Sequence, residues 1–203
     1  MLKRIYPSDL SNGEYKFLKK CLPKQRNFGR PGKYERREIL NAIFYLLRTD
    51  CAWRYLPRDY PDWQSVYHYL RQWRRAGIWK RLNKKLRRVL RKKAGRHTQA
   101  SAACLDSQSV KTVDTARRES IGYDAGKRIK ERKRHILVDT PGLLITVTVH
   151  AADISETADG KLVLAELIEK WWRLCLIRLD GGYMAGLFEW VKSIKRGREC
   201  WRV

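Results

Sequence analysis

Two aspartates each follow a short apolar run, and they are the strongest candidates for chemistry in this sequence. Asp106 follows residues 102–105, and Asp180 follows residues 174–179. Short apolar runs are typical of buried strands. A helix between the two runs would allow the strands to be parallel, with both carboxylates at one edge of a sheet. Carboxylate oxygens could hold Mg²⁺ there. Aspartates at strand ends are also common turn formers, so spacing alone leaves both interpretations open.

The elements expected around these aspartates form a mixed α/β sheet with an antiparallel edge. A hairpin is predicted from the β-branched runs on either side of Thr140-Pro141-Gly142. In chain order the expected elements are a strand at 102–105, hairpin strands at 134–139 and 143–150, a helix from Asp153 or Ser155 to about 172, a strand at 174–179 and a helix at 184–192.

The first half of the chain is predicted to be helical. Residues 35–48 have helical apolar spacing, and Asp62 or Ser65 could cap a second helix with an apolar face. A third helix at 79–93 carries an apolar stripe and a basic opposite face. Its expected stripe is Trp79, Leu82, Leu86, Val89 and Leu90. The tryptophans of this half, Trp53, Trp63, Trp73 and Trp79, are expected to anchor its core.

The charge is unevenly distributed between the two halves. The 203 residues carry 45 Lys and Arg against 21 Asp and Glu, a net charge of +24. Residues 1–98 hold 27 of the basic and 7 of the acidic residues. We therefore expect a basic helical DNA-binding region at 1–98 and a second domain at 99–203. A polyanion is the usual partner of such an excess of positive charge.

The basic residues most suited to DNA binding lie on the third helix and near the predicted sheet. No Asp or Glu lies between Gly77 and Arg96, so DNA contact is favoured over a merely solvated helix face, because like charges on one helix repel each other. Lys111 follows Asp106 closely and could contact a substrate phosphate. The candidate DNA-binding residues are Lys80, Lys84, Lys85, Arg87, Arg88, Arg91, Lys111, Lys127, Arg132 and Arg134.

Several segments resemble bacterial insertion-sequence transposases of the DDE type, whose catalytic core is ribonuclease-H-like. The resemblance covers roughly residues 6–193. It is carried by 105–112 (LDSQSVKT), 122–127 (GYDAGK), 132–144 (RKRHILVDTPGLL), 179–183 (LDGGY), 51–57 (CAWRYLP) and 63–67 (WQSVY). It implies a helical DNA-binding region followed by a ribonuclease-H-like sheet, with Asp106 and Asp180 as catalytic and metal-binding residues. It also implies cleavage and strand transfer with Mg²⁺ or Mn²⁺ on double-stranded DNA, namely terminal inverted repeats and a target. A homodimer on the DNA is left open.

The family's third catalytic acid, a glutamate on a later helix, has no counterpart here. After Lys192 the sequence no longer resembles the family, so we expect a C-terminally truncated, incomplete core that is inactive alone. Asp139 should lie at the opposite edge of the sheet from Asp106. Two alternatives stay open. One is a non-catalytic protein that occupies element ends and could inhibit a full-length transposase. The other is a nuclease whose site Glu189 or Glu199 completes.

Other sites are disfavoured by the sequence. The cysteines are odd in number and widely spaced, which favours reduced thiols over a zinc site or disulfides: Cys21, Cys51, Cys104, Cys175 and Cys200. His135 is expected to be structural rather than catalytic. No apolar run is long enough to span a membrane, and no signal peptide is recognisable, so we expect a cytoplasmic protein associated with the bacterial nucleoid.

Overall fold

The computed structural model describes residues 5–23, 32–111, 122–124, 129–151, 160–161, 163–165, 173–179, 187 and 190. The chain divides into two compact units, Met1–Lys84 and Lys85–Val203. The division falls within the last N-terminal helix, ahead of the boundary after residue 98 that the sequence suggests. No helix of the described residues is long and apolar enough to cross a membrane.

The first unit is helical, as expected. Its described elements are α1 (Asn12–Lys19), α2 (Arg36–Thr49), the 3-10 turn η1 (Trp53–Tyr55), α3 (Trp63–Arg75) and the start of α4 (Ile78–Lys93). Side chains cap these helices. Ser11 and Glu14 form a reciprocal capping box on α1, and the Asp62 carboxylate accepts from the Ser65 backbone N–H at 2.9 Å. Asp62 is therefore the N-cap of α3, one of the two residues expected there.

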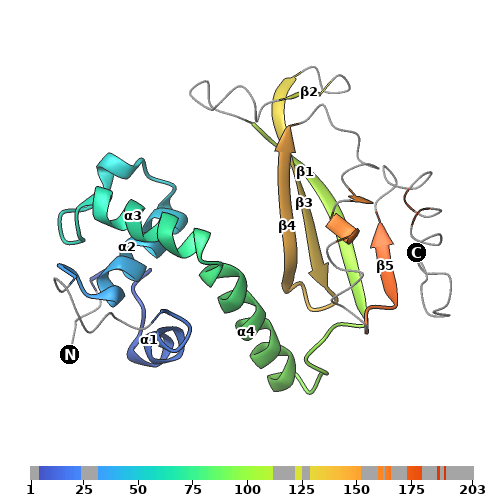
Figure 1. Ribbon diagram of the computed structural model, residues 1–203, viewed down its shortest axis with the longest axis horizontal. Coiled ribbons are helices and arrows are strands. Elements are labelled where there is room, and N and C mark those ends of the chain that lie inside the picture. The colour runs from blue at the N-terminus through green and yellow to red at the C-terminus, as the bar shows by residue number, and fades with distance from the viewer. Residues whose placement is uncertain are drawn as a thin grey trace. The chain divides into compact units, whose positions relative to one another are not determined.

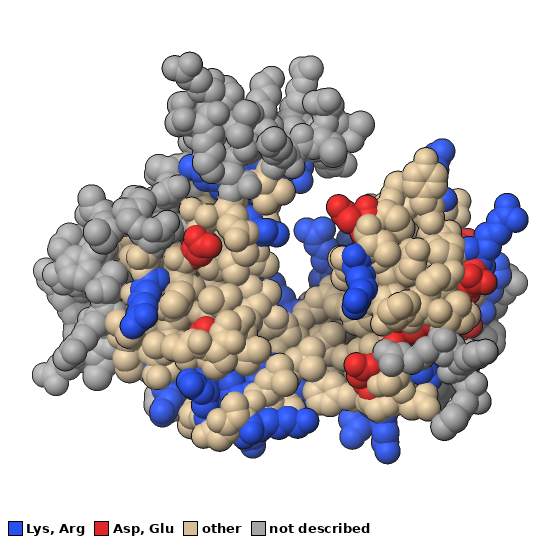
Figure 2. Space-filling model, turned by 180° about the vertical axis from the view of Figure 1, so that it is seen from behind, with Lys and Arg blue, Asp and Glu red and all other residues tan. Residues whose placement is uncertain are grey.

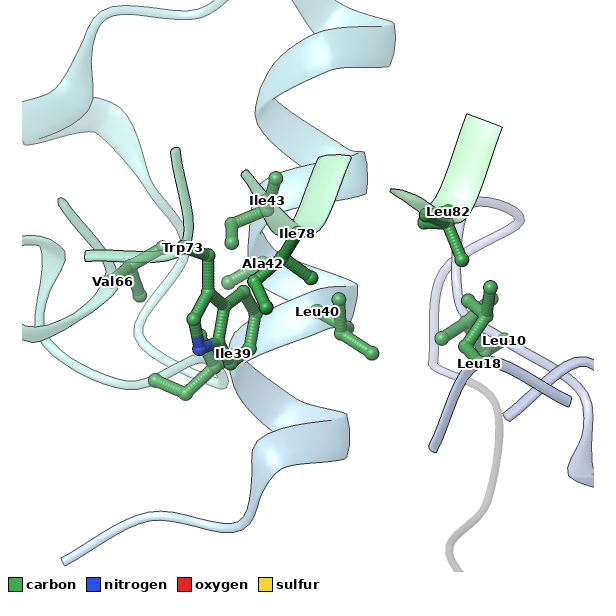
Figure 3. Close-up of a cluster of buried hydrophobic side chains, with 10 residues drawn as sticks. All are labelled: Leu10, Leu18, Ile39, Leu40, Ala42, Ile43, Val66, Trp73, Ile78 and Leu82. Atoms are coloured by element: carbon green, nitrogen blue, oxygen red, sulfur yellow. The ribbon is translucent and has the colours of Figure 1, made fainter. Parts of the chain in front are cut away.

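One hydrophobic cluster holds these helices together (Figure 3). Ile39 and Ile43 of α2 pack with Trp73 of α3, and each is at most 2% exposed. The remaining members are Leu10, Leu18, Leu40, Ala42, Val66, Ile78 and Leu82. Trp73 is thus a core residue, as predicted, and its indole ring contacts Trp79 edge-on at 6.0 Å between centroids.

The apolar stripe predicted for α4 is wrong in its second half. Leu82 is 8% exposed, but Leu86 and Leu90 are 37% and 46% exposed. Arg87 and Arg91 are buried instead, at 6% and 4% exposure. The apolar periodicity therefore locates the part of α4 that packs in the first unit, whereas polar contacts determine how its second half packs.

The second unit contains a five-stranded mixed sheet (Figure 1). Its strands are β1 (Ala102–Lys111), β2 (Gly122–Asp124), β3 (Ile129–Asp139), β4 (Leu144–Ala151) and β5 (Leu176–Leu179). β1 pairs with β3 antiparallel on one edge and with β5 parallel on the other. β2 and β4 both pair antiparallel with β3. The hairpin turn contains Gly142 at a φ of 79°, a conformation that suits glycine. This mixed α/β architecture, with helices first and the sheet second, agrees with the fold class expected from the sequence.

One face of the sheet is covered by a second hydrophobic cluster. Leu105 of β1, Leu137 of β3 and Ile177 of β5 are each at most 2% exposed. Residues 163 and 164, which are helical, and Leu187 pack against them. Most of the helices expected at about 153–172 and 184–192 lies outside the described residues. The cluster fixes which residues of β1 face inward, and so which face outward.

Candidate functional site

The parallel pairing of β1 and β5 joins the two segments that precede the candidate aspartates. Leu105 lies opposite Leu179 in the register, directly before Asp106 and Asp180 in the sequence. Asp106 itself is exposed, and it lies opposite Ile136 on the antiparallel side. The sequence predicted that the strand ends just before Asp106. This prediction is wrong, because β1 continues to Lys111. Asp106 lies directly after the last described pair of β1 with β5. Asp180 lies outside the described residues.

Strand alternation places Asp106 on the face opposite the core. Leu105 is buried in the hydrophobic cluster, so the neighbouring Asp106 points to the other face. Residues paired in register share a face of the sheet, and Cys104 and Gln108 lie on the same face as Asp106. Arg178 of β5 pairs with Cys104, and Arg134 of β3 pairs with Gln108. Both arginines therefore lie on the face of Asp106. Arg134 donates from Nη2 to Oε1 of Gln108 at 2.6 Å. The face therefore presents a carboxylate between guanidinium groups.

Arg132 also lies on this face, opposite Val110. By strand alternation Arg132 and Arg134 share this face, whereas Lys133 and His135 share the other. Arg178 was missed as a candidate. Its spacing two residues before Asp180 on a predicted strand could have identified it, since side chains two apart share a face.

The basic candidates on α4 separate into exposed and buried residues. Lys80, Lys84 and Arg88 are exposed, and Lys85 is half-buried. Arg132 and Arg134 on β3 are half-buried. The side chains of Lys111 and Lys127 lie outside the described residues.

Arg87 and Arg91, two of the DNA-binding candidates, have side chains that are buried in internal contacts. Arg91 Nη1 donates to Asp139 Oδ2 at 2.6 Å, and its Nε donates to the His97 carbonyl at 2.7 Å. Arg87 Nη1 donates to the Leu144 carbonyl at 2.6 Å. The two arginines thus fasten the second half of α4 to the β3–β4 hairpin, and neither guanidinium faces solvent.

Asp139 ends β3 on the buried face of the sheet, three residues from Ile136, which lies opposite Asp106. It pairs in register with Ala103, near the start of β1, and its carboxylate is bound to Arg91 and to the Leu143 backbone N–H. Glu189 and Glu199, the other acids considered, lie outside the described residues. Within the described ranges, no group of three or more His, Cys, Asp or Glu side chains could hold a metal ion.

His135 is a core residue of the sheet, in keeping with the structural role predicted for it. It is 0% exposed, and its ring stacks on His150 of β4 with 4.7 Å between centroids. Burial, together with the nearby His150 and Lys133, lowers the pKa of His135 to about 4. The imidazole is therefore neutral at physiological pH.

A basic cavity in the first unit was missed by the sequence analysis. Its volume is about 590 Å³, and it is lined by Tyr67, Leu70, Arg71, Arg74, Arg75 and Trp79. The sequence signal was present in α3, where Tyr67, Arg71 and Arg74 follow each other at helical spacing.

Two transposase family models match the chain, one within each unit. Residues 10–83 match the family model "Putative transposase of IS4/5 family", and residues 97–200 match the model "Transposase DDE domain". The chain is 35% identical over 95 residues to "Insertion element IS402 uncharacterized 16.2 kDa protein" of Burkholderia cepacia, covering 45% of this chain and 63% of the relative. The chain thus spans less than two thirds of that relative's length. A solved structure, "Mos1 transposase paired-end complex with left transposon end", is 14% identical with a TM-score of 0.32, covering 85% of this chain and 60% of that one.

Proposed function

Because this chain belongs to the DDE transposase family, we propose that it is a DNA transposase in which Asp106 and Asp180 are the catalytic residues and hold a divalent metal ion, Mg²⁺ or Mn²⁺. Its substrates would be the terminal inverted repeats of its own element and a target DNA. Work on DNA would place it at the bacterial nucleoid, and two copies could act together on the two element ends.

The observation that carries this proposal is the parallel register of β1 and β5. Leu105 is paired with Leu179. If the register continued by one residue, Asp106 and Asp180 would be neighbours on adjacent strands, which are about 4.8 Å apart. Both side chains would then project from the face opposite the hydrophobic core. Two adjacent carboxylates supply the oxygen donors that a hard divalent cation prefers, so these residues fit such an ion.

The chemistry divides between the carboxylates and the basic residues around them. A bound divalent ion would activate the attacking oxygen and stabilise the leaving oxygen of the phosphodiester. Arg178 and Arg134, on the same face as Asp106, can bind phosphate oxygens through charged hydrogen bonds and hold the DNA strand in place. The exposed basic residues of α4, Lys80, Lys84 and Arg88, would bind the DNA backbone away from the cut. Lys85, Lys111, Lys127 and Arg132 complete the proposed DNA-binding set.

We further propose that the family's third metal-holding acid has no counterpart among the residues described in the second unit. Asp139 is the other acid whose side chain is described in the second unit, and it is buried on the opposite face of the sheet from Asp106, bound to Arg91. Losing one of three metal-holding carboxylates leaves the cation poorly neutralised, so we expect metal and DNA to bind without cleavage.

A Mn²⁺ titration followed by electron paramagnetic resonance tests the carboxylate pair. Asp106→Asn and Asp180→Asn should each weaken Mn²⁺ binding roughly 10-fold or more, because each removes a charged ligand. Asp50→Asn is the matched control, since Asp50 is an exposed aspartate of the first unit with a φ of 52°, which asparagine also accepts. Unchanged Mn²⁺ binding in both site variants would contradict the proposal.

Cleavage of supercoiled plasmid in Mg²⁺ or Mn²⁺ separates the remaining alternatives. We expect none from the chain alone, with DNA binding retained. Cleavage that requires Asp106, Asp180 and also Glu189 or Glu199 would favour the nuclease. Salt-sensitive DNA binding combined with no metal binding at Asp106 would favour a protein that only occupies element ends.

A further inference from the structure

The cavity between α3 and the start of α4 is lined by three arginines and two aromatic residues. Arg71, Arg74 and Arg75 line it together with Tyr67 and Trp79. At about 590 Å³ it lies in the range of small-molecule binding sites. Every lining residue belongs to the first unit, so the cavity does not depend on the sheet.

The three arginines form an arrangement that is unfavourable without an anion. Arg71 is three residues from Arg74 and four from Arg75, which are spacings at which like charges on a helix repel each other. All three are exposed, and α3 contains no Asp or Glu. No carboxylate in the described part of the chain forms an ion pair with any of them. An anion in the cavity would relieve this repulsion.

The two rings are held in place by other aromatic residues. Tyr67 is 40% exposed, and it contacts Trp53 edge-on at 5.1 Å between centroids. The Arg71 guanidinium lies 5.6 Å from the centre of the Tyr67 ring. Trp79 is half-buried against Trp73. Each ring is therefore held in place at the wall of the cavity. A planar group could stack on it without having to immobilise the side chain.

We propose that this cavity binds an unpaired nucleotide of DNA, with its base against the Tyr67 and Trp79 rings and its phosphate on the arginines. In a duplex the base faces are stacked on each other, so only an unpaired base can offer one to an aromatic ring. A simple phosphate site would need the guanidinium groups but not the rings. This proposal rests on the proposed function only in taking DNA as the ligand.

Fluorescence anisotropy with a labelled oligothymidylate of about eight nucleotides tests the arginines. The titration is done in EDTA, so that no metal ion contributes. Arg74→Ala should weaken binding roughly 10-fold, because it removes a phosphate contact. Arg48→Ala is the matched control, since Arg48 is an exposed arginine near the end of α2, outside the cavity, and its loss should matter little. Equal effects of the two substitutions would overturn the proposal.

A second pair of variants tests the rings. Tyr67→Leu should weaken oligothymidylate binding at least about fivefold, whereas Tyr67→Phe, which keeps the ring, should not. Thermal melting identifies any loss of fold in Tyr67→Leu, and the Arg74 comparison does not depend on it. If Tyr67→Leu binds like the wild type, or if both Arg74→Ala and Tyr67→Leu weaken a blunt duplex as much as the single strand, the cavity is not a nucleotide site.

The outcome is independent of the metal site. Asp106→Asn should leave oligothymidylate binding in EDTA unchanged, and Arg74→Ala should leave Mn²⁺ binding unchanged. Failure of the oligonucleotide experiment therefore rejects the cavity and leaves the proposed transposase function standing, whereas loss of both kinds of binding from the wild-type protein would reject the two together.

Discussion

At the residue scale, the clearest result is that Arg91 and Asp139 form a buried ion pair. Their side chains are 5% and 0% exposed, with 2.6 Å between Nη1 and Oδ2. The Asp139 carboxylate also accepts the Leu143 N–H on Oδ1 at 2.8 Å, so each of its two oxygens accepts a hydrogen bond. Two desolvated charges tolerate the interior only while each has its partner.

Removing one member of this pair should therefore cost much more than removing both. We expect Arg91→Met or Asp139→Leu to lower the free energy of unfolding by about 3–5 kcal/mol, and the double substitution to recover much of that loss. Urea denaturation measures each difference. Arg88→Met, on the exposed side of the same helix, should change it by less than about 0.5 kcal/mol. Additive effects of the two single substitutions would show that the pair is not coupled.

His135 makes the sheet sensitive to acid. Its pKa is about 4 in the folded protein and 6.5 in an unfolded chain, so between these values the unfolded state binds more protons. Stability contributed by the neutral His135 is then complete above about pH 6.5 and is lost as the pH falls towards 4. The full loss is on the order of 3 kcal/mol. His135→Phe should flatten the urea midpoint between pH 4 and 6.5, and an unchanged pH dependence in this variant would contradict the assignment.

At the element scale, the sequence predicts most helices and strands but not every face. α2 and α3 follow apolar spacing, and the hairpin follows its β-branched runs, so their positions are confirmed. The length of β1 was not predictable, because the residues after Leu105 are polar except for Val110, and they are held in the strand by pairing with β3 rather than by burial. The inward face of α4 beyond Leu82 was not predictable either. Arg87 and Arg91 are buried through hydrogen bonds to the hairpin, and apolar periodicity cannot detect such contacts.

This view of α4 gives a test within one helix. Leu82→Ala should lower the free energy of unfolding by about 2–5 kcal/mol, because Leu82 belongs to the core of the first unit. Leu90→Ala removes the same atoms from a side chain that is 46% exposed, and it should cost less than about 1 kcal/mol. Urea denaturation of the two variants measures these changes. Similar losses of unfolding free energy would indicate that Leu82 and Leu90 are equally important to packing, as the predicted apolar stripe implies.

In the candidate site, too, the sequence predicts the residues set by local spacing but not those set by tertiary contacts. The outward direction of Asp106 and the shared face of Arg132 and Arg134 follow from strand alternation, which can be recognised in the sequence. Arg178 and the α3 cavity depend on which strands pair and which helix ends meet. Those contacts are set by tertiary packing, so local spacing alone did not distinguish the arginines of α3 from an ordinary solvated face.

At the scale of the whole molecule, the net charge of +24 is distributed over both units. Figure 2 shows basic side chains exposed on both parts of the chain. Such a surface binds DNA largely by releasing counterions from phosphates, which makes the affinity fall steeply with salt. The internal use of Arg87 and Arg91 means that some of the formal charge cannot take part in that exchange.

Salt titrations of duplex binding can therefore separate the basic residues of α4 by role. Lys84→Ala and Arg88→Ala should each reduce the slope of log K against log salt by about 1, because each would remove one phosphate contact. Arg87→Met carries the same charge loss from a side chain that is 6% exposed, so its slope should stay near that of the wild type while its stability falls. If all three variants lower the slope equally, net charge alone governs DNA binding. If Lys84→Ala and Arg88→Ala leave the slope unchanged, the exposed face of α4 does not contact the DNA backbone.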